Sequence, residues 1–265
     1  MKTLDFLDKL LFQLTVQLIM TPKDEFVTCK EDETIANLKE RLKKFDFIPV
    51  YADKIKYYVS KIDVENTLKK NSSEKVKEIK QFISEKKPIS EESSIHDYLL
   101  NRNEPVFVTK DNEVVGMVTP ADLNKISSKM VFYIILSNLE QILINLIKKQ
   151  HFEENKIEGY LGFTKLWNAK GIFELNKREN MVLSVFECMN ISDLICITYK
   201  SKEIRKILNY STENEAKKDL CPLVDLRNKI MHTGYSFIQN EKQLNKRRLQ
   251  YLLIKQLITE LLEQT

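Results

Sequence analysis

Glycine and proline are scarce in this sequence. It holds 5 glycines and 6 prolines among 265 residues. Tight turns draw heavily on these two residue types, so their scarcity favours a helix-rich fold with few such turns. Hydrophobic residues make up 43% of the chain and charged residues 30%, which excludes intrinsic disorder. The length leaves room for two domains, each with its own core.

The chain also lacks the residue spacings that bind metals. Its four cysteines form no C-x-x-C pair, and no histidine cluster accompanies them: Cys29, Cys188, Cys196 and Cys221. No metal site is expected, and the cysteines are predicted to be reduced core thiols of a cytoplasmic protein. There is no glycine-rich phosphate loop, G-x-S-x-G or H-E-x-x-H motif, so the enzyme classes defined by those motifs are not indicated.

No charge of one sign dominates. The chain carries 42 basic and 38 acidic residues, and a net charge of +4 does not by itself predict nucleic-acid binding. Charges at Asp5, Asp8 and Lys9 interrupt any signal-peptide core. The most apolar stretch, 130–147, contains polar residues such as Ser137 and Glu140. We expect it to be a buried bundle helix, with no membrane span.

Leucines repeat at three- and four-residue spacing near the beginning of the chain: Leu4, Leu7, Leu11, Leu14 and Leu18. This spacing predicts an amphipathic helix over 1–19. The helix is expected to pack either on its own domain or across a dimer. The dipeptide Thr21-Pro22 is predicted to end it.

A strand–turn–strand unit then occurs twice within 20–126. The first copy has predicted strands at 26–29, 47–51 and 55–59, and the second has them at 105–108 and 113–118. A helix is predicted to begin after each last strand, with Ser60 and Asp63 in the first copy and Thr119 and Asp122 in the second. Ser60 to Thr119 spans 119 − 60 = 59 residues, and Asp63 to Asp122 spans 122 − 63 = 59. The matched spacing indicates an internal duplication.

From residue 127 onward the patterns are helical only. Helices are predicted at 179–199, 202–208 and 214–231 and around 254–262, with an aromatic connector at 159–171 that contains the only tryptophan, Trp167. The predicted fold class is therefore α+β. It consists of β-α-β-β-α repeats at 20–126 followed by an all-α bundle at 127–265.

A polar cluster lies near the end of the predicted helix 214–231. An apolar stripe is expected on one face of the helix, formed by Leu223, Leu226 and Ile230. The opposite face carries Asp225, Asn228 and His232, Arg227 lies between the two faces, and Gly234 is expected to stop the helix.

These residue types suit phosphodiester chemistry. A guanidinium such as that of Arg227 binds phosphate through two parallel hydrogen bonds, and an imidazole such as that of His232, with an ordinary pKa of ~6.5, transfers protons. Asn228 is placed to orient His232 or bind phosphate. On a continuous helix Arg227 and His232 would be ~140° apart. Either the helix unwinds near Gly234 or a second subunit completes the site, and we expect the latter. The competing interpretation is an ordinary helix surface, with His232 favoured at a helix C-terminus.

Residues ~20–125 resemble a tandem pair of CBS domains, the Bateman module. The segments IPVYADKIKYYVSKIDV (48–64) and EPVFVTKDNEVVGMVTPADL (104–123) carry the resemblance. The second matches the family ending G-h-h-T-x-x-D. The first departs from it, with Tyr58 taken to stand in place of the glycine, which is expected to narrow or block one of two clefts.

This resemblance implies a regulatory adenine nucleotide as ligand: AMP, ADP, ATP or a cyclic adenylate. Its ribose would bind the aspartate, and its phosphate would face the helix N-terminus. Thr119 and Asp122 would form the better site, and Ser60 and Asp63 the weaker one. The alternative is that Ser60 and Thr119 only cap their helices.

The string RNKIMH (227–232) resembles the R-N-x-x-x-H motif of HEPN domains, many of which are endoribonucleases with a composite site across a dimer. Glu140 resembles the acidic residue that orients the arginine in that family. The resemblance implies a homodimer acting on RNA without metal or catalytic cofactor, with Arg227, Asn228 and His232 as catalytic residues. The basic run 246–248 would guide RNA or form a solvated face.

The combined prediction is a nucleotide-regulated endoribonuclease of the stress, toxin or antiviral type. The alternative is a non-enzymatic protein that senses a nucleotide, dimerises or binds a partner, and carries an inactive HEPN-like domain.

Overall fold

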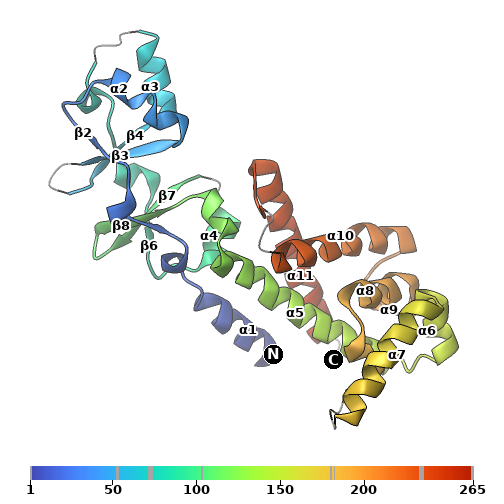
Figure 1. Cartoon of the computed structure of the whole chain (residues 1–265). Coiled ribbons are helices and arrows are strands. Elements are labelled where there is room, and N and C mark those ends of the chain that lie inside the picture. The colour runs from blue at the N-terminus through green and yellow to red at the C-terminus, as the bar shows by residue number, and fades with distance from the viewer. Residues whose placement is uncertain are drawn as a thin grey trace. The chain divides into compact units, whose positions relative to one another are not determined.

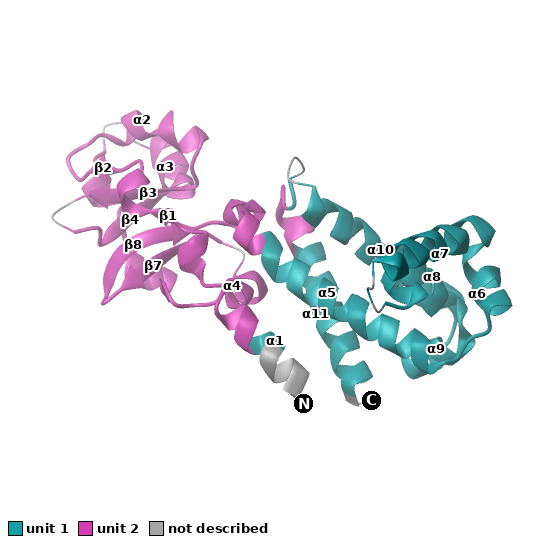
Figure 2. Ribbon diagram, turned by 60° about the horizontal axis from the view of Figure 1, so that its bottom comes forward, with its two compact units in different colours: residues 1–8, 129–237, 245–265 teal, residues 9–128, 238–244 magenta. Residues whose placement is uncertain are grey.

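The computed structural model describes residues 2–51, 54–70, 74–102, 104–179, 181, 183–232 and 236–263. It divides into two units (Figure 2). Unit 1 comprises residues 1–8, 129–237 and 245–265, and unit 2 comprises residues 9–128 and 238–244. The predicted domains 1–19, 20–126 and 127–265 stay predictions, because compactness alone does not establish independently folding parts.

Unit 2 contains two four-stranded sheets, with strand orders β2-β3-β4-β5 and β1-β8-β7-β6 (Figure 1). The strands of the first sheet are β2 (Cys29–Lys30), β3 (Phe47–Tyr51), β4 (Tyr57–Ser60) and β5 (Gln81–Phe82). Those of the second are β1 (Thr21–Pro22), β6 (Ile89–Ser90), β7 (Val106–Lys110) and β8 (Glu113–Val118). Each sheet is built around one copy of the repeat, as the duplication predicts.

The two repeats exchange their outermost strands. Strand β1, which precedes the first repeat, pairs with β8 of the second, with Thr21 opposite Met117. Strand β5, which precedes the second repeat, pairs with β4 of the first, with Gln81 opposite Tyr58. Pro22 fits here because β1 is an edge strand, where a missing N–H costs no ladder bond. Thr21 and Pro22 thus form a strand, and the strand predicted at 26–29 is observed only at Cys29–Lys30.

Short α-helices connect the strands of unit 2. They are α2 (Ile35–Leu38), α3 (Lys61–Leu68) and α4 (Ile95–Asn101). Ser60 accepts a hydrogen bond of 3.1 Å from the Asp63 backbone N–H, so the predicted N-cap of α3 is confirmed. After Thr119 the chain forms a short 3-10 turn, Pro120–Asn124, in place of an α-helix.

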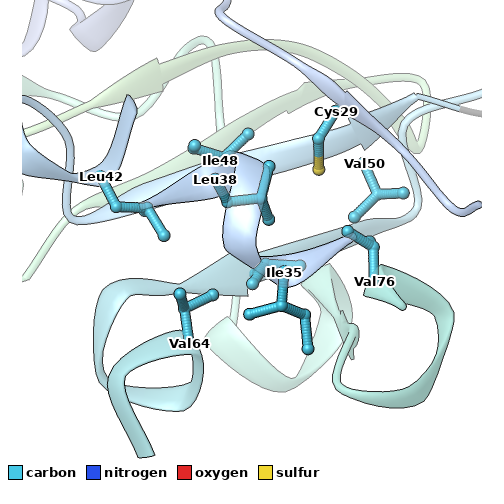
Figure 3. Packing of buried hydrophobic residues seen from close by; sticks show 9 residues of the cluster. Cys29, Ile35, Leu38, Leu42, Ile48, Val50, Val64 and Val76 are labelled. Carbon is cyan, nitrogen blue, oxygen red and sulfur yellow. The ribbon is translucent and has the colours of Figure 1, made fainter. Parts of the chain in front are cut away.

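The first repeat has its own apolar core between its sheet and its helices (Figure 3). Nine residues form it: Cys29, Ile35, Leu38, Leu42, Ile48, Val50, Val59, Val64 and Val76. Burial raises the pKa of the Cys29 thiol to about 11, which keeps it protonated and unreactive at neutral pH. This core holds the hairpin β3–β4, and therefore Ser60 and Asp63, in place.

Unit 1 is helical. Its elements are α5 (Ile126–Lys149, from Lys129 on), α6 (Glu154–Leu161), α7 (Phe163–Arg178), α8 (Ile191–Lys200), α9 (Lys202–Ile207), α10 (Glu213–Met231) and α11 (Glu241–Glu263, from Asn245 on). Aromatic rings link three of its segments, since Phe132 of α5 lies 4.8 Å from Phe237 and 5.8 Å from Tyr251 of α11 between ring centroids. The predicted α+β class is therefore confirmed.

Helix α5 is long and apolar enough, by length and composition, to cross a membrane. Its most apolar window has a mean hydropathy of 1.7, and 56% of that window is buried inside the protein. Val131, Ile135 and Leu139 are all fully buried along one side. Such burial is the behaviour of a core helix, which was the prediction for 130–147.

Two predicted helices and one predicted connector differ from the structure. Helix α1 covers Lys2–Phe12 rather than 1–19, and Leu18 is exposed. The connector predicted at 159–171 is helical, in α6 and α7. The helix predicted at 179–199 is broken, because Asn190 caps α8 by accepting a hydrogen bond of 3.1 Å from the Asp193 N–H. Asparagine competes for backbone groups in this way, which favours a helix start over a helix interior.

Candidate functional site

A cavity of about 430 Å³ opens between the two repeats inside unit 2. The 3-10 turn contributes Thr119 and Asp122 to its wall, and the first repeat contributes Phe47 and Lys44. Phe26 lies on the segment between β1 and β2 and also lines it. The size falls in the range of small-molecule sites. The structure therefore places both residues of the better predicted site in one cavity.

Asp122 is held by several donors although it is only 7% exposed. Its Oδ2 accepts hydrogen bonds from the Thr119 backbone N–H at 2.7 Å and from Thr119 Oγ1 at 2.8 Å. Its Oδ1 lies 2.8 Å from the ammonium of Lys125, which also donates to the carbonyl of Ile19. Buried charges need such partners. A ligand hydroxyl must use a remaining lone pair of the carboxylate or displace Lys125.

The corresponding pair in the first repeat is covered by the chain itself. Gln81 Nε2 donates a hydrogen bond of 2.7 Å to Asp63 Oδ2, and the Tyr58 hydroxyl donates to Gln81 Oε1. Ser60 Oγ also donates to Asp63. Tyr58 is 1% exposed and packs its ring against Phe107, with centroids 5.9 Å apart. Ser60 and Asp63 thus lie close together, but donors from the chain itself, on Gln81 and Ser60, occupy the carboxylate that a ligand hydroxyl would donate to.

Tyr57, and not Tyr58, stands in the place of the glycine in the first repeat. In the first sheet Tyr57 pairs with Val50, and in the second Gly116 pairs with Val108. Tyr57 therefore occupies the place of the family glycine, and Tyr58 occupies the place of Met117. The expected narrowing of one cleft by Tyr58 still has a physical basis, because its side chain is buried beside Gln81 and Asp63. Burial, and next the charge of Asp63, raises the pKa of Tyr58 to about 12.

In unit 1 a small cavity of about 80 Å³ lies between α5 and α10. Glu140 and Ser137 line it from α5, and Arg227 lines it from α10. Burial raises the pKa of Glu140, and the guanidinium of Arg227 partly offsets this by favouring the carboxylate. The structure thus brings Glu140 and Arg227, which are far apart in sequence, to one place.

The remaining residues of the motif lie at the exposed end of α10. Leu223 and Leu226 are fully buried and Ile230 is 8% exposed, so the predicted apolar stripe is confirmed. Asn228 and His232 are exposed and do not line the small cavity. The helix ends at Met231, and His232 has extended backbone angles of φ −95° and ψ 113°.

Because α10 ends before His232, the ~140° separation of a continuous helix does not apply to its side chain. The backbone N–H of His232 still donates to the Asn228 carbonyl at 3.1 Å, and Lys129 Nζ lies 3.5 Å from the His232 carbonyl. The predicted stop at Gly234 lies outside the described residues, which omit 233–235.

The basic run 246–248 is not one solvated face. Arg247 is 2% exposed, and its Nη1 donates to Gln250 Oε1 at 2.7 Å. Burial lowers the pKa of Arg247. Arg247 therefore lies outside the exposed face that this run was expected to form, whether that face is solvated or guides RNA. Across the described parts of the chain, no three His, Cys, Asp or Glu residues are grouped so that they could hold a metal ion.

No protein-family model matches the chain, and no curated protein does. Among solved structures, a hemolysin-like protein containing a CBS domain from Oenococcus oeni PSU is similar, with 20% identity and a TM-score of 0.33 over 41% of this chain and 86% of that one. CBSX2 of Arabidopsis thaliana, in complex with AMP, has 19% identity and a TM-score of 0.35 over 44% and 97%.

The CBS domain of a bacterial CNNM/CorC family Mg²⁺ transporter, in complex with ATP, has 20% identity and a TM-score of 0.35 over 46% of this chain and 90% of that one. All three are CBS-domain proteins, the family that the duplicated segments resemble. The likeness concerns the fold alone and covers less than half of the chain.

Proposed function

We propose that unit 2 binds an adenine nucleotide in the cavity at Thr119 and Asp122, and that this binding regulates a metal-independent endoribonuclease site on α10. The observation that carries the first part is the cavity itself, about 430 Å³ in volume with a buried carboxylate in its wall. The duplicated carboxylate, Asp63, is covered by Gln81. The proposal therefore assigns one nucleotide to each chain.

The lining of the cavity suits the parts of a nucleotide. Phe26, Phe47 and Met117 offer apolar surface to a purine base. Asp122 accepts hydrogen bonds from ribose hydroxyls, and Lys44 supplies positive charge for phosphate. Each group acts on a different part of the ligand, so together they distinguish a nucleotide from a free base or a free phosphate.

Thermal unfolding with AMP, ADP, ATP and cyclic adenylates tests this site. A ligand at 100 times its Kd stabilises the folded chain by about 2.7 kcal/mol. Asp122→Asn keeps the shape of the side chain but removes its charge, and we expect the nucleotide-induced shift to be lost. The matched control is Asp63→Asn, which should leave the shift intact. A chain that none of these nucleotides stabilises, or equal effects of the two variants, would contradict the proposal.

The second part concerns RNA cleavage. The 2′-oxygen attacks the neighbouring phosphorus and the bond from phosphorus to the 5′-oxygen breaks, which leaves a 2′,3′-cyclic phosphate and a 5′-hydroxyl. One group takes the proton from the 2′-oxygen and another gives a proton to the 5′-oxygen. His232 is suited to one of these transfers, and His232 of a second copy to the other, so the active form would be a homodimer.

Arg227 stabilises the charge that develops on the phosphate, with Glu140 beside it to hold the guanidinium. Asn228 lies one helical turn before His232, is exposed, and is available for phosphate or for orienting the imidazole. The observation that favours this function is the shared cavity of Glu140 and Arg227 at the helix end that carries the exposed motif.

A nuclease assay on labelled RNA, with and without nucleotide and with a chelator present, tests the catalytic part. His232→Ala and Arg227→Ala should each abolish cleavage. Lys229 lies on the same helix, and its ammonium pairs with the carboxylate of Asp225 at 3.3 Å. Lys229→Ala is therefore the control and should keep cleavage. If wild type cuts no RNA under any condition while nucleotide still stabilises it, the non-enzymatic sensor is the better description. Cleavage that survives both motif variants would belong to a contaminant or to another site.

A further inference from the structure

The backbones of two adjacent residues, Phe237 and Ile238, form hydrogen bonds with the side chains of different residues. Asn124, which precedes them in the sequence, binds Ile238, and Arg247, which follows them, binds Phe237. Asn124 forms two hydrogen bonds with the backbone of Ile238. Its Nδ2 donates to the Ile238 carbonyl at 2.8 Å, and its Oδ1 accepts from the Ile238 N–H at 2.8 Å. Ile238 is 5% exposed, and the two hydrogen bonds are partly buried. A primary amide that both donates to the carbonyl and accepts from the N–H of one residue fixes the position of that residue's backbone.

Asn124 belongs to the element that forms the nucleotide cavity. It is the last residue of the 3-10 turn Pro120–Asn124, which also carries Asp122. The next residue, Lys125, is the ammonium partner of Asp122. Ser128 Oγ donates to the Asp122 carbonyl at 3.3 Å, which joins the turn to the residues that follow it. Asn124 lies two residues after Asp122 and directly before Lys125, so a ligand that moves this pair would also move Asn124.

Phe237 is held from the other direction. It is fully buried, and Arg247 Nε donates to its carbonyl at 3.3 Å while the guanidinium lies 4.9 Å from its ring centroid. Arg247 donates to Gln250 at 2.7 Å, and Gln250 Nε2 donates to the carbonyl of Pro222 at 2.9 Å. Pro222 lies inside α10, the helix that carries Arg227 and Asn228.

These contacts form an unbroken series. It runs from Asn124 to Ile238, across one peptide bond to Phe237, and then through Arg247 and Gln250 to α10. Ile238 also follows His232 by six residues in the sequence. Leaving a buried or partly buried hydrogen bond unmade is costly, so such groups exchange between discrete hydrogen-bonded arrangements.

We propose that Asn124 is a positioning residue that transmits occupancy of the cavity at Asp122 to Phe237–Ile238, and through Arg247 to α10. This inference rests on the proposed function and deepens it by naming the residue that couples ligand and motif. A ligand shifts the equilibrium only if it prefers one arrangement of the turn, and the Asp122–Lys125 pair is the contact whose change would create that preference.

Hydrogen exchange measured by mass spectrometry tests it, with ATP and AMP as separate probes. In wild type, the nucleotide that stabilises the chain should change the rate of amide hydrogen exchange in peptides covering 236–244 by about tenfold. A change of this size is expected when about one hydrogen bond is made or broken. In Asn124→Leu the same nucleotide should still raise the melting temperature but leave those peptides unchanged. Asn124→Asp keeps the acceptor for the Ile238 N–H and should retain part of the response. The control, Asn37→Leu, alters an exposed asparagine of α2 and should behave as wild type.

The outcomes separate the two proposals. If wild type binds nucleotide without any change at 236–244, or if Asn124→Leu keeps the full change, the coupling role fails while the nucleotide site stands. If no nucleotide stabilises the chain, the nucleotide site fails and the coupling role fails with it. Where RNA cleavage is detected, Asn124→Leu should keep the basal rate and lose its response to nucleotide. Should Asn124→Leu not fold, Asn124→Asp alone must show a reduced response, and a full response would overturn the inference.

Discussion

Gln81 donates a hydrogen bond of 2.7 Å to the carboxylate of Asp63. The duplicated carboxylate, Asp122, instead faces the ammonium of Lys125 at 2.8 Å beside an open cavity. The register explains the difference, because Gln81 lies opposite Tyr58 just as Thr21 lies opposite Met117. A longer amide and a larger ring in the first sheet fill the space that a threonine and a methionine leave open in the second.

Exchanging these residues should open the covered cleft. The double variant Tyr58→Met and Gln81→Thr gives the first repeat the side chains of the second, so Asp63 loses the hydrogen bond from Gln81. We expect isothermal titration with the nucleotide that stabilises wild type to show two sites per chain where wild type shows one. Gln81→Thr alone keeps the buried ring and should remain at one site. A stoichiometry of one in the double variant would mean that Asp63 is unsuited to a ligand for another reason.

Gly116→Ala should destabilise unit 2. A Cβ at this position would lie 2.5 Å from Met20 Sδ and 2.9 Å from the Thr21 carbonyl oxygen, and a backbone atom cannot move aside without breaking the pairing of β1 with β8. The expected loss is about 1–3 kcal/mol in the free energy of unfolding, measured with urea. Gly171→Ala is the matched control. It lies in α7 with nothing within 4 Å of the added carbon, and it should stabilise the chain by up to about 1 kcal/mol.

Tyr58 should make stability depend on pH in the alkaline range. Its pKa is raised from 10.0 to about 12 by burial and by nearby carboxylates. The folded chain therefore holds this proton more tightly than the unfolded chain does. The stabilisation is complete below pH 10 and is lost as the pH rises from 10 to 12, with a size on the order of 2 kcal/mol.

Urea unfolding of wild type and Tyr58→Phe between pH 8 and pH 11 measures this effect. At pH 8 the variant should be less stable by about 1 kcal/mol, because Gln81 loses a donor. The gap should shrink above pH 10. Tyr51→Phe, at an exposed position, should follow wild type at every pH. A constant gap across the range would show that Tyr58 ionises no differently in the folded and unfolded chains.

Glu140→Gln should separate stability from catalysis. Burial raises the pKa of Glu140, so its ionisation works against folding, and this cost grows as the pH rises above the ordinary value of 4.5. At pH 7 the variant should be at least as stable as wild type, whereas at pH 3 the two should be equal. RNA cleavage should fall, because Arg227 loses its anionic neighbour. Glu174→Gln on the exposed surface of α7 should change neither property, and a loss of stability in Glu140→Gln at pH 7 would contradict this account.

Patterns confined to one or two helical turns were enough to predict several features. Ser60 caps α3, and Leu223, Leu226 and Ile230 form a buried stripe, because capping and amphipathic packing depend on residues three or four apart. The matched spacing of Ser60 and Thr119 similarly predicted the duplicated hairpins. The extent of α1 was missed because the leucine repeat continues past Phe12, where the helix ends. The break before α8 was missed because apolar periodicity does not reveal a competing cap such as Asn190.

Features that join distant parts of the chain were settled by packing alone. Two-residue strands such as β1 and β5 carry no periodicity that a sequence could reveal, and their exchange between repeats appears only once the sheets form. The burial of Arg247 within an apparently basic run and the covering of Asp63 by Gln81 have the same origin. Each depends on which side chains lie within a few ångströms after folding, and local propensity does not determine that.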